Sequence, residues 1–404
     1  MIQRDSYIQK IRPFIGKDII KVLTGIRRSG KSTLLELLKR KLVANGEEDS
    51  QFLTINFENL TYQSLSIAEI YENIKTFCDK NPQNSYIFLD EVQEITGWEK
   101  LVNSLRVTTG ADIYITGSNS NLLSGELATH LAGRYIEISV YPLSFKEISE
   151  WSNKQSPLAL DSEDLFRKYV RLGGFPFIYA SELDEQAALS YLLDIYQSIM
   201  LKDIVARYGV RDIELLNRVF LFFFSNFGQT FSANSVTAFL KNEKRSISQE
   251  TLYNYIAYAQ EACLTYLIPR YDIKGKRSLS FQEKLFIADT GIREAVFGYN
   301  ERDISQVLEN IVFLELLRRG YTVNIGKVDG NEVDFVASKA RERLYLQVAY
   351  ILADESTIER EFSPLGEITD NFPKKVLSLD KFDRSQNGIR HQNIIDFLLE
   401  ENLN

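Results

Sequence analysis

A short glycine-bounded loop, with a predicted strand before it and a predicted helix after it, most constrains the fold of this chain. The segment 25–32 reads GIRRSGKS; residues 19–24 form a short β-branched strand, and leucines recur at helical spacing from residue 34. The two glycines let the backbone curl so that its N–H groups point inward at a phosphate, and the helix N-terminus adds a dipole that favours anions. The sequence therefore predicts a nucleotide-binding loop. Its expected contacts are Gly25, Arg28, Ser29, Gly30, Lys31, Ser32 and Thr33.

Two acids follow the next strongly apolar strand. The stretch SYIFLDEVQE places apolar residues at 86–89 and then Asp90 and Glu91. In such sites an acid at a strand end shares Mg²⁺ with a loop hydroxyl, and a second residue orients the attacking water. We therefore expect Ser32 and Asp90 to hold Mg²⁺ and Glu91 to be catalytic. Lys31 should reach the β- and γ-phosphates of ATP.

A third apolar strand ends in polar residues. The stretch ADIYITGSNSNLL carries Ser118 and Asn119 at a place where a polar side chain can lie between the acid and the γ-phosphate. Together with strands near 51–57 and 135–140, the count of strands reaches five. Strands that alternate with helices predict an α/β fold with a parallel sheet covered on both faces.

The composition limits the class of protein. The length of 404 residues suggests two to three domains, at about 150 residues each. A protein that wraps nucleic acid over a wide face is usually basic, so a net charge of −8 restricts any such contact to a local patch. With only Cys78, Cys263, His130 and His391, a disulfide framework is excluded and a zinc cluster nearly so. The polar N-terminus is unlike a signal peptide, and no apolar run approaches the ~20 residues that span a bilayer. We expect a cytoplasmic protein with no membrane partner.

The motifs GIRRSGKSTLL, FLDEVQ, TGSNSNLL, LAGRYIEISVYPLSFKEI and GGFP together resemble those of the bacterial and archaeal AAA+-related ATPases that carry a C-terminal domain of unknown function. The resemblance covers essentially the whole chain. It implies a P-loop AAA+-type ATPase domain over 1–150 and a sensor at Ser118 or Asn119. It also implies an arginine finger at Arg134, which precedes the last core strand at the sheet edge. An Arg there can serve a neighbour's nucleotide in a homo-oligomer, or it can form a surface salt bridge.

The middle of the chain, over 151–300, predicts a helical segment followed by a winged helix. Its last part has the order helix, turn, helix, hairpin, with basic residues in both turns. One interpretation is DNA binding, with the second helix in the major groove and the wing on phosphate. The alternative is that the winged helix packs on protein. The candidate DNA contacts are Lys244, Arg245, Lys274, Lys276 and Arg277.

The order of elements over 301–404 resembles the PD-(D/E)xK nuclease fold. Glu309 and Asp334 match two of its acidic positions, whereas Gln347 stands where a further acid belongs and Ala349 where the Lys belongs. Nuclease chemistry needs clustered carboxylates for Mg²⁺ and a Lys to position water or stabilise charge. The sequence therefore predicts a degenerate site without cleavage. Lysines that could replace the missing one are Lys327, Lys339 and Lys374.

These expectations define the function that the sequence predicts. The chain should bind and hydrolyse ATP with Mg²⁺, and turnover should drive or license a conformational change in a C-terminal half that contacts nucleic acid or a protein client. One alternative is a DNA-processing nuclease gated by ATP. Another is a signalling or scaffold switch in which nucleotide state sets partner binding and nothing is cut.

Overall fold

The computed structural model separates into two units, which are described one after the other. Unit 1 comprises residues 1–142 with 261–263, and unit 2 comprises 143–260 with 264–404. The structure describes residues 1–82, 84–120, 133–155 and 160–401.

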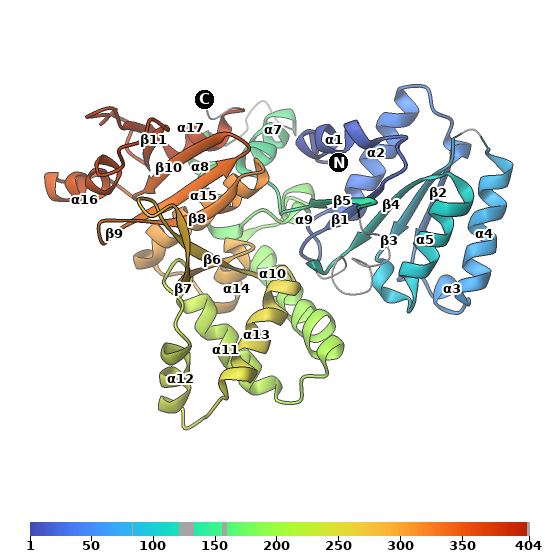
Figure 1. Cartoon of the computed structure of the whole chain (residues 1–404), viewed down its shortest axis with the longest axis horizontal. Coiled ribbons are helices and arrows are strands. Elements are labelled where there is room, and N and C mark those ends of the chain that lie inside the picture. The colour runs from blue at the N-terminus through green and yellow to red at the C-terminus, as the bar shows by residue number, and fades with distance from the viewer. Residues whose placement is uncertain (83, 121–132, 156–159, 402–404) are drawn as a thin grey trace. The chain divides into compact units, whose positions relative to one another are not determined.

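Unit 1 is built on a five-stranded sheet in which every paired strand is parallel (Figure 1). The order β2-β3-β4-β1-β5 places β1 inside the sheet and leaves β2 and β5 at its edges. This confirms the predicted α/β parallel sheet. The strands are β1 (Ile20–Thr24), β2 (Phe52–Asn56), β3 (Tyr86–Asp90), β4 (Asp112–Gly117) and β5 (Tyr135–Ser139). The helices are α1 (Asp5–Ile11), α2 (Lys31–Ala44), α3 (Leu60–Gln63), α4 (Ile67–Lys80) and α5 (Trp98–Thr109), with 3-10 turns at Arg12–Phe14, Asp49–Gln51 and Val92–Glu94.

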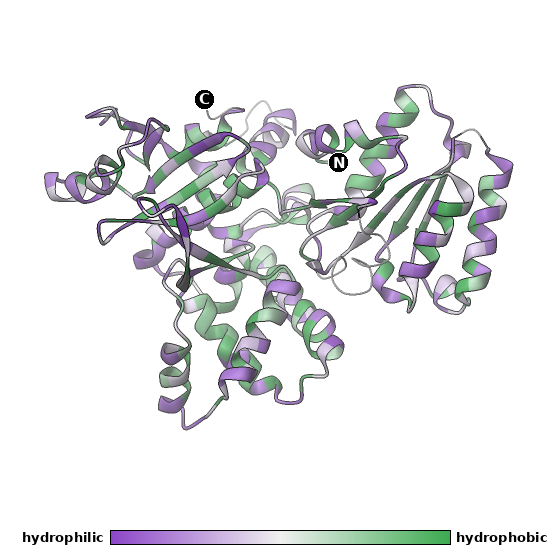
Figure 2. Cartoon of the chain, viewed as in Figure 1, coloured by the Kyte–Doolittle hydropathy of each residue, from purple (hydrophilic) through white to green (hydrophobic). Residues whose placement is uncertain are grey.

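Two apolar cores lie on the two faces of this sheet. One contains side chains of α1 and α2, and the other contains side chains of α4 and α5. Successive strand residues point to opposite faces, so Val22 belongs to one core and Leu23 to the other. Figure 2 shows the strands as mainly hydrophobic and the outer faces of α4 and α5 as hydrophilic. The amphipathic helices therefore cover a sheet that is apolar on both faces.

Unit 2 contains a mixed sheet with helices around it. Its order is β12-β11-β10-β9-β8-β6-β7. The strands are β6 (Thr265–Asp272), β7 (Arg277–Ile287), β8 (Thr322–Val328), β9 (Asn331–Lys339), β10 (Glu342–Val348), β11 (Lys374–Ser378) and β12 (Arg390–Asn393). The helices are α7 (Phe145–Gln155), α8 (Ser162–Leu172), α9 (Pro176–Ala180), α10 (Glu185–Ser198), a π-helix (Ile199–Ala206), α11 (Ile213–Ser225), α12 (Ala233–Asn242), α13 (Gln249–Glu261), α14 (Thr290–Phe297), a 3-10 turn (Glu301–Asp303), α15 (Ile304–Arg318), α16 (Glu355–Gly366) and α17 (Ile394–Leu399). No helix in the described part of the chain has the length and apolarity that crossing a membrane requires.

The hairpin β6–β7 is part of this sheet. The sequence predicts it as the wing of a winged helix, and the order α12, turn, α13, hairpin is present. Strand β6, however, pairs in parallel with β8, from Arg270 opposite Ile325 to Asp272 opposite Lys327. The sheet therefore runs across the domain boundary predicted near residue 300, and the hairpin forms one edge of the C-terminal sheet. The winged helix stays a prediction.

A buried ion pair joins two central strands of unit 1. Lys21 on β1 is fully buried, and its ammonium group contacts the carboxylate of Asp112 on β4. The same carboxylate accepts hydrogen bonds from Gly16 N and Tyr114 Oη, both at 2.8 Å. Burial lowers the pKa of Lys21, and Asp112 opposes that shift. Removing the acid therefore leaves a buried ammonium group that has lost its carboxylate.

We predict that Asp112→Ala lowers the free energy of unfolding by about 3–5 kcal/mol, because breaking a buried ion pair leaves the other charge buried without its counter-ion. Urea unfolding followed by tryptophan fluorescence measures the change. A Lys21→Met, Asp112→Asn double variant should lose clearly less than the single variant. The control is Asp18→Ala, which removes an exposed carboxylate paired with Arg106 and should cost about 0–1 kcal/mol. Equal losses for Asp112→Ala and Asp18→Ala would contradict the prediction.

Candidate functional site

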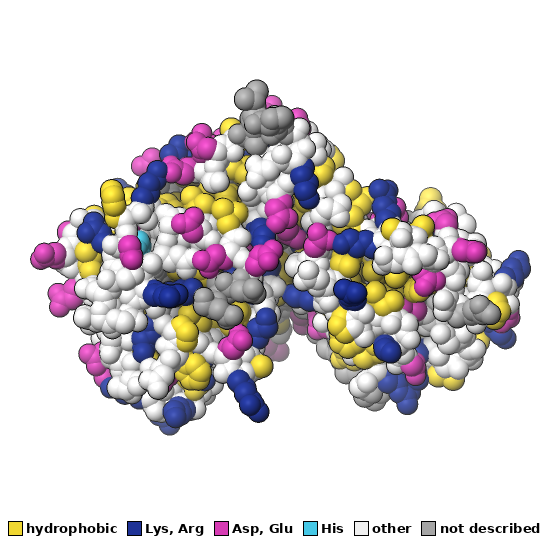
Figure 3. Space-filling model, turned by 90° about the horizontal axis from the view of Figure 1, so that it is seen from above, with side chains coloured by type: hydrophobic (Ala, Val, Ile, Leu, Met, Phe, Trp, Pro, Cys, Tyr) yellow, Lys and Arg dark blue, Asp and Glu magenta, His cyan; other side chains and the backbone are white. Residues whose placement is uncertain are grey.

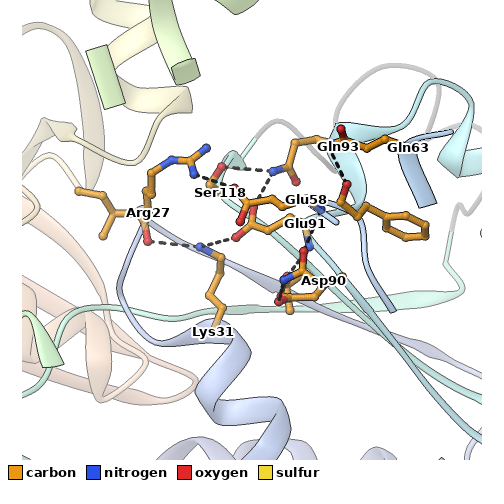
Figure 4. A network of polar contacts seen from close by, with 12 residues as sticks. Arg27, Lys31, Glu58, Gln63, Asp90, Glu91, Gln93 and Ser118 are labelled. Carbon is orange, nitrogen blue, oxygen red and sulfur yellow. Dashed lines mark hydrogen bonds and ion pairs between the residues drawn. The ribbon is translucent and has the colours of Figure 1, made fainter. Parts of the chain in front are cut away.

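The predicted phosphate loop connects the end of β1 to the start of α2. Gly25 has a φ of +139°, and a β-carbon there would lie 2.2 Å from the Val140 carbonyl oxygen, so only glycine fits. Gly30, directly before α2, is left-handed, with a φ of +98°. Lys31 begins the helix, and its Nζ donates to the carbonyls of Gly25 at 3.0 Å and Ile26 at 3.3 Å. The loop therefore curls around the amine that the sequence expects to bind phosphate (Figure 4).

Asp90 ends β3 beside the predicted hydroxyl. Asn56 Nδ2 donates to one of its carboxylate oxygens at 2.9 Å, and Thr116 Oγ1 donates to the other. Burial raises the pKa of Asp90, and hydrogen bonds from Thr116 and Ser32 oppose that shift. The structure thus brings Ser32 and Asp90 together, as predicted for a shared Mg²⁺. Asn56 is not among the residues singled out from the sequence, whereas Thr116 belongs to the polar end of the third predicted strand.

Glu91 points back at the P-loop. Its carboxylate lies 3.8 Å from Lys31 Nζ, and Gln93 Nε2 donates to it at 2.5 Å. The residue is left-handed, with a φ of +53°, and its N–H donates to Thr116 Oγ1 at 2.9 Å. The same Gln93 amide also donates to Ser118 Oγ at 3.5 Å. Gln93 therefore links the expected catalytic acid to the expected sensor; it lies two residues after Glu91, a spacing that gave no signal in the sequence.

The remaining predicted residues of this site have defined places. Ser118 and Asn119 are buried just after β4, next to the strand ends that carry the P-loop and Asp90. Arg134 is exposed immediately before the edge strand β5. Arg27, which also lies in the P-loop, donates to Glu58 at 3.2 Å. The P-loop is thereby tied to the segment that follows β2.

The donor set around the P-loop suits Mg²⁺. It offers the hydroxyl of Ser32 and the carboxylate of Asp90, which are hard oxygen ligands. Among the described residues, no group of three or more His, Cys, Asp or Glu side chains is placed to hold a metal ion. Mg²⁺ commonly takes one or two protein oxygens, with water and substrate phosphates completing its shell. The site therefore fits Mg²⁺ that arrives with a nucleotide.

A second charged cluster lies in unit 2 around Lys284 on β7. Its Nζ is 2.6 Å from a carboxylate oxygen of Glu309 on α15, 3.1 Å from Glu332 and 3.8 Å from Asp334, the last two on β9. The sequence suggests Lys327, Lys339 or Lys374 for this position, but Lys339 and Lys374 donate to the backbone carbonyls of Arg319 and Asp370. The lysine that joins the acids therefore comes from the hairpin predicted as a wing. Only the pairing of β6 with β8 brings it there.

The strand that follows carries no charge into this cluster, as the sequence predicts. Gln347 Oε1 accepts the backbone N–H of Asp334 at 2.9 Å, and the N–H of Val348 donates to Asp334 Oδ2 at 2.8 Å. Ala349 is buried in an apolar core. Gln347 thus holds the backbone that carries Asp334.

In the Lys284 cluster a single ammonium group is the ion-pair partner of three carboxylates. Burial, together with the neighbouring Asp334, raises the pKa of Glu309 to about 8. Burial also raises the pKa of Asp334 to about 6, against the opposing effect of Lys284. Burial lowers the pKa of Lys284, but the carboxylates outweigh this and raise it above its ordinary value. The lysine therefore stays charged at neutral pH, and Glu309 is protonated more readily than an ordinary glutamate.

A Ser–His contact in unit 2 resembles a nucleophile and its base. Ser378 Oγ lies 2.8 Å from His391 Nε2, and Ser378 is fully buried. The backbone N–H of Arg384 donates to His391 Nδ1 at 3.2 Å, so in the neutral ring Nε2 carries the proton. Ser378 Oγ in turn donates to Asp380 at 2.7 Å. The imidazole cannot accept the serine proton in this arrangement, so the contact is structural.

Unit 2 also has a cavity of about 970 Å³ whose lining includes no residue of the Lys284 cluster. It opens beside α8 and the ends of β10 and β11. Its cations are already ion-paired: Arg167 with Asp164 at 2.9 Å, Arg171 with Glu185 at 2.6 Å, and Lys381 with Glu163. This lining favours neither sign of charge in a ligand.

Two family models match parts of the chain. A family model described as an AAA domain matches residues 17–149, and one described as a domain of unknown function (DUF8612) matches residues 163–303. An uncharacterized protein of Haemophilus influenzae is 40% identical over 402 residues, which cover 99% of each chain. The uncharacterized protein MJ1544 of Methanocaldococcus jannaschii is 32% identical over 372 residues, which cover 89% of this chain and 80% of its own. Among solved structures, the ORC1 protein of Aeropyrum pernix in complex with DNA is 12% identical and superposes with a TM-score of 0.34 over 73% of this chain and 92% of that chain.

The raised pKa values predict how stability depends on pH. Glu309 and Asp334 bind protons more tightly in the folded state than in the unfolded state, so this contribution to stability falls as pH rises from about 4.5 to about 8. Glu309→Gln fixes the neutral form. We therefore expect the variant to gain stability relative to the wild type over that range, by up to about 1.4 kcal/mol per pH unit.

Urea unfolding at about pH 5, 7 and 8.5 measures this difference. The matched control is Glu301→Gln, which neutralises an exposed acid shortly before α15. The difference in the free energy of unfolding between this control and the wild type should not change with pH. If the difference for Glu309→Gln is also independent of pH, Glu309 is ionised over the whole range measured.

Proposed function

We propose, from the premise that the chain belongs to the family of AAA-domain proteins that includes its Haemophilus and Methanocaldococcus relatives, that it binds Mg²⁺–ATP and hydrolyses it. The observation that carries the proposal is the meeting of four side chains from two separate segments of the chain. Lys31 and Ser32 begin α2, Asp90 ends β3, and Glu91 lies 3.8 Å from the amine of Lys31. A P-loop alone would indicate phosphate binding. An acid facing the P-loop lysine adds the means of hydrolysis.

Each residue has a distinct role in this mechanism. Lys31 exchanges its bonds to the Gly25 and Ile26 carbonyls for phosphate oxygens. Ser32 and Asp90 hold the Mg²⁺, which when bound supplies neutralising charge for the phosphates. Glu91 accepts a hydrogen bond from the attacking water and orients it.

We also propose that Arg134 acts as an arginine finger in trans. It is exposed and precedes β5, which is an edge strand of the ATPase sheet. An arginine supplied by a neighbouring copy would neutralise charge in the transition state. The proposal therefore includes a homo-oligomer in which Arg134 of one copy serves the nucleotide of the next.

The proposed role of unit 2 is to change conformation with nucleotide state and to contact a protein client. Three of the five cations predicted to contact DNA are already ion-paired: Arg245 with Glu214, Lys274 with Asp329, and Arg277 with Asp272 at 3.8 Å. On the face in view in Figure 3, Lys and Arg are interspersed with Asp and Glu. Binding to DNA needs Lys and Arg side chains that are available to contact phosphates. The ion pairs and the mixed charges therefore favour a protein partner over DNA.

We also propose that the C-terminal domain does not cut nucleic acid. Cleavage of a phosphodiester by this class of fold needs a divalent cation among the carboxylates. Here Lys284 Nζ lies among the three acids, 2.6 Å from Glu309. The raised pKa of Glu309 further reduces the negative charge available to a metal. The residues present therefore do not fit a catalytic Mg²⁺.

The first test separates binding from hydrolysis. Lys31→Ala should abolish nucleotide affinity, because it removes the charge that contacts phosphate. Glu91→Gln should keep ATP affinity while kcat falls on the order of 10²-fold or more, because one positioned catalytic contact is lost. Nucleotide titration and steady-state ATPase assays measure the two effects, with Glu94→Gln as the control in the same segment. A Glu91→Gln protein with normal turnover would remove Glu91 from the mechanism.

The second test concerns cleavage. Purified protein is incubated with circular DNA, linear DNA or RNA, in Mg²⁺ or Mn²⁺ and with or without ATP. Every substrate should stay intact, because the Lys284 ammonium group lies among the carboxylates that a divalent cation would need. Asp334→Ala and Lys284→Met are assayed in parallel to identify any contaminating nuclease. Cleavage by the wild type that disappears in Asp334→Ala would show that the site is active, and its loss in Lys284→Met as well would make Lys284 the lysine of that site.

A further inference from the structure

A buried arginine that belongs to none of the sequence motifs contacts the backbone of the P-loop. Arg4 precedes α1, is 2% exposed, and its Nη1 donates to the carbonyl of Ser29 at 3.0 Å. Its Nη2 donates to the carbonyl of Tyr141 at 2.8 Å. One guanidinium group thus bridges the P-loop and the segment just after β5.

The position of Arg4 is fixed by helix α1. The Arg4 carbonyl accepts the N–H groups of Tyr7 and Ile8, which begin the helix. Tyr7 packs in the apolar core beneath the sheet, and its ring lies 4.5 Å from the guanidinium carbon. The Tyr7 hydroxyl also accepts the N–H of Tyr141 at 3.0 Å. Packing of α1 therefore holds the guanidinium against its two carbonyl partners.

This contact determines how one P-loop peptide is oriented. In a planar trans peptide, the C=O and the following N–H point in opposite directions. A guanidinium that holds the Ser29 carbonyl on the buried side therefore turns the Gly30 N–H toward the opposite side. This peptide lies next to a strained position, because Arg28, the residue before Ser29, has a positive φ of 68°. Hydrogen bonds to a charged donor are among the stronger ones that a carbonyl can accept.

We propose that Arg4 is a positioning residue for ATP binding, which orients the Gly30 N–H toward the β-phosphate; this rests on the proposed ATPase function. Arg4 itself touches no reacting atom. A P-loop N–H contacts the phosphates before and during the reaction alike, so its loss weakens both states equally. Loss of such uniform binding raises KM and leaves kcat unchanged. That pattern is the opposite of the one expected for Glu91.

The experiment compares Arg4→Ala, Arg4→Lys and Arg12→Ala in the full-length chain. Arg12 is an exposed arginine in the same N-terminal segment and serves as the matched control. Arg4→Ala should raise both the KM for ATP and the Kd for a fluorescent ATP analogue about tenfold, with kcat unchanged. Arg4→Lys should give a smaller rise, because an ammonium group cannot span both carbonyls. Arg12→Ala should behave as the wild type.

Chemical rescue separates positioning from a general structural role. Guanidinium ion at low concentration should restore part of the ATP affinity of Arg4→Ala, whereas methylammonium ion should not. If Arg4→Ala does not fold, Arg4→Lys supplies the test through its KM. An unchanged KM and Kd, or a fall in kcat without a change in KM, would overturn the proposal. A wild type that binds the analogue without hydrolysing ATP would refute the ATPase function, while the Kd comparison would still decide the role of Arg4.

Discussion

The carbonyl oxygen of Val140 occupies the space that a side chain on residue 25 would need, 2.2 Å from where a β-carbon would be. This close approach is possible because β5 pairs with β1 and carries residue 140 past the start of the P-loop. It forces glycine at the loop entrance and brings Tyr141 within reach of Arg4. The shape of the phosphate loop therefore depends on the last strand of the sheet, more than a hundred residues away, as well as on its own glycines.

The parts of the site that the sequence could predict are those set by local chain geometry. The P-loop needs glycines, a lysine and a hydroxyl at fixed spacing between a strand and a helix, and Asp90 and Glu91 need only to follow a buried strand. Parallel strands end at one edge of a sheet, so these separate segments had to meet. Gln93, Asn56 and Arg4 could not be found in this way, because each acts through a hydrogen bond whose partner depends on packing.

In unit 2 the composition of the charged cluster depends on strand pairing as well as on the local sequence. The acids Glu309 and Asp334 and the neutral Gln347 could be assigned from the order of helix and strands. Lys284 could not, because its place depends on the parallel pairing of β6 with β8, and nothing local indicates that pairing. A hairpin after two helices looks the same in sequence whether it is a free wing or a sheet edge. The edge position is what brings the Lys284 ammonium group to the carboxylates of Glu309, Glu332 and Asp334.

One hydroxyl group connects the two acids of the ATPase site. Thr116 Oγ1 donates its hydrogen to Asp90 and accepts the N–H of Glu91 at 2.9 Å. A hydroxyl has a single hydrogen, so donation to Asp90 leaves only its lone pairs for the backbone of Glu91. That acceptance supports the left-handed conformation of Glu91, which costs free energy in a residue with a side chain. The threonine at the end of β4 therefore contacts both Asp90, the acid proposed to hold the metal, and the backbone of Glu91, the acid proposed to orient the water, and it links the placement of the two.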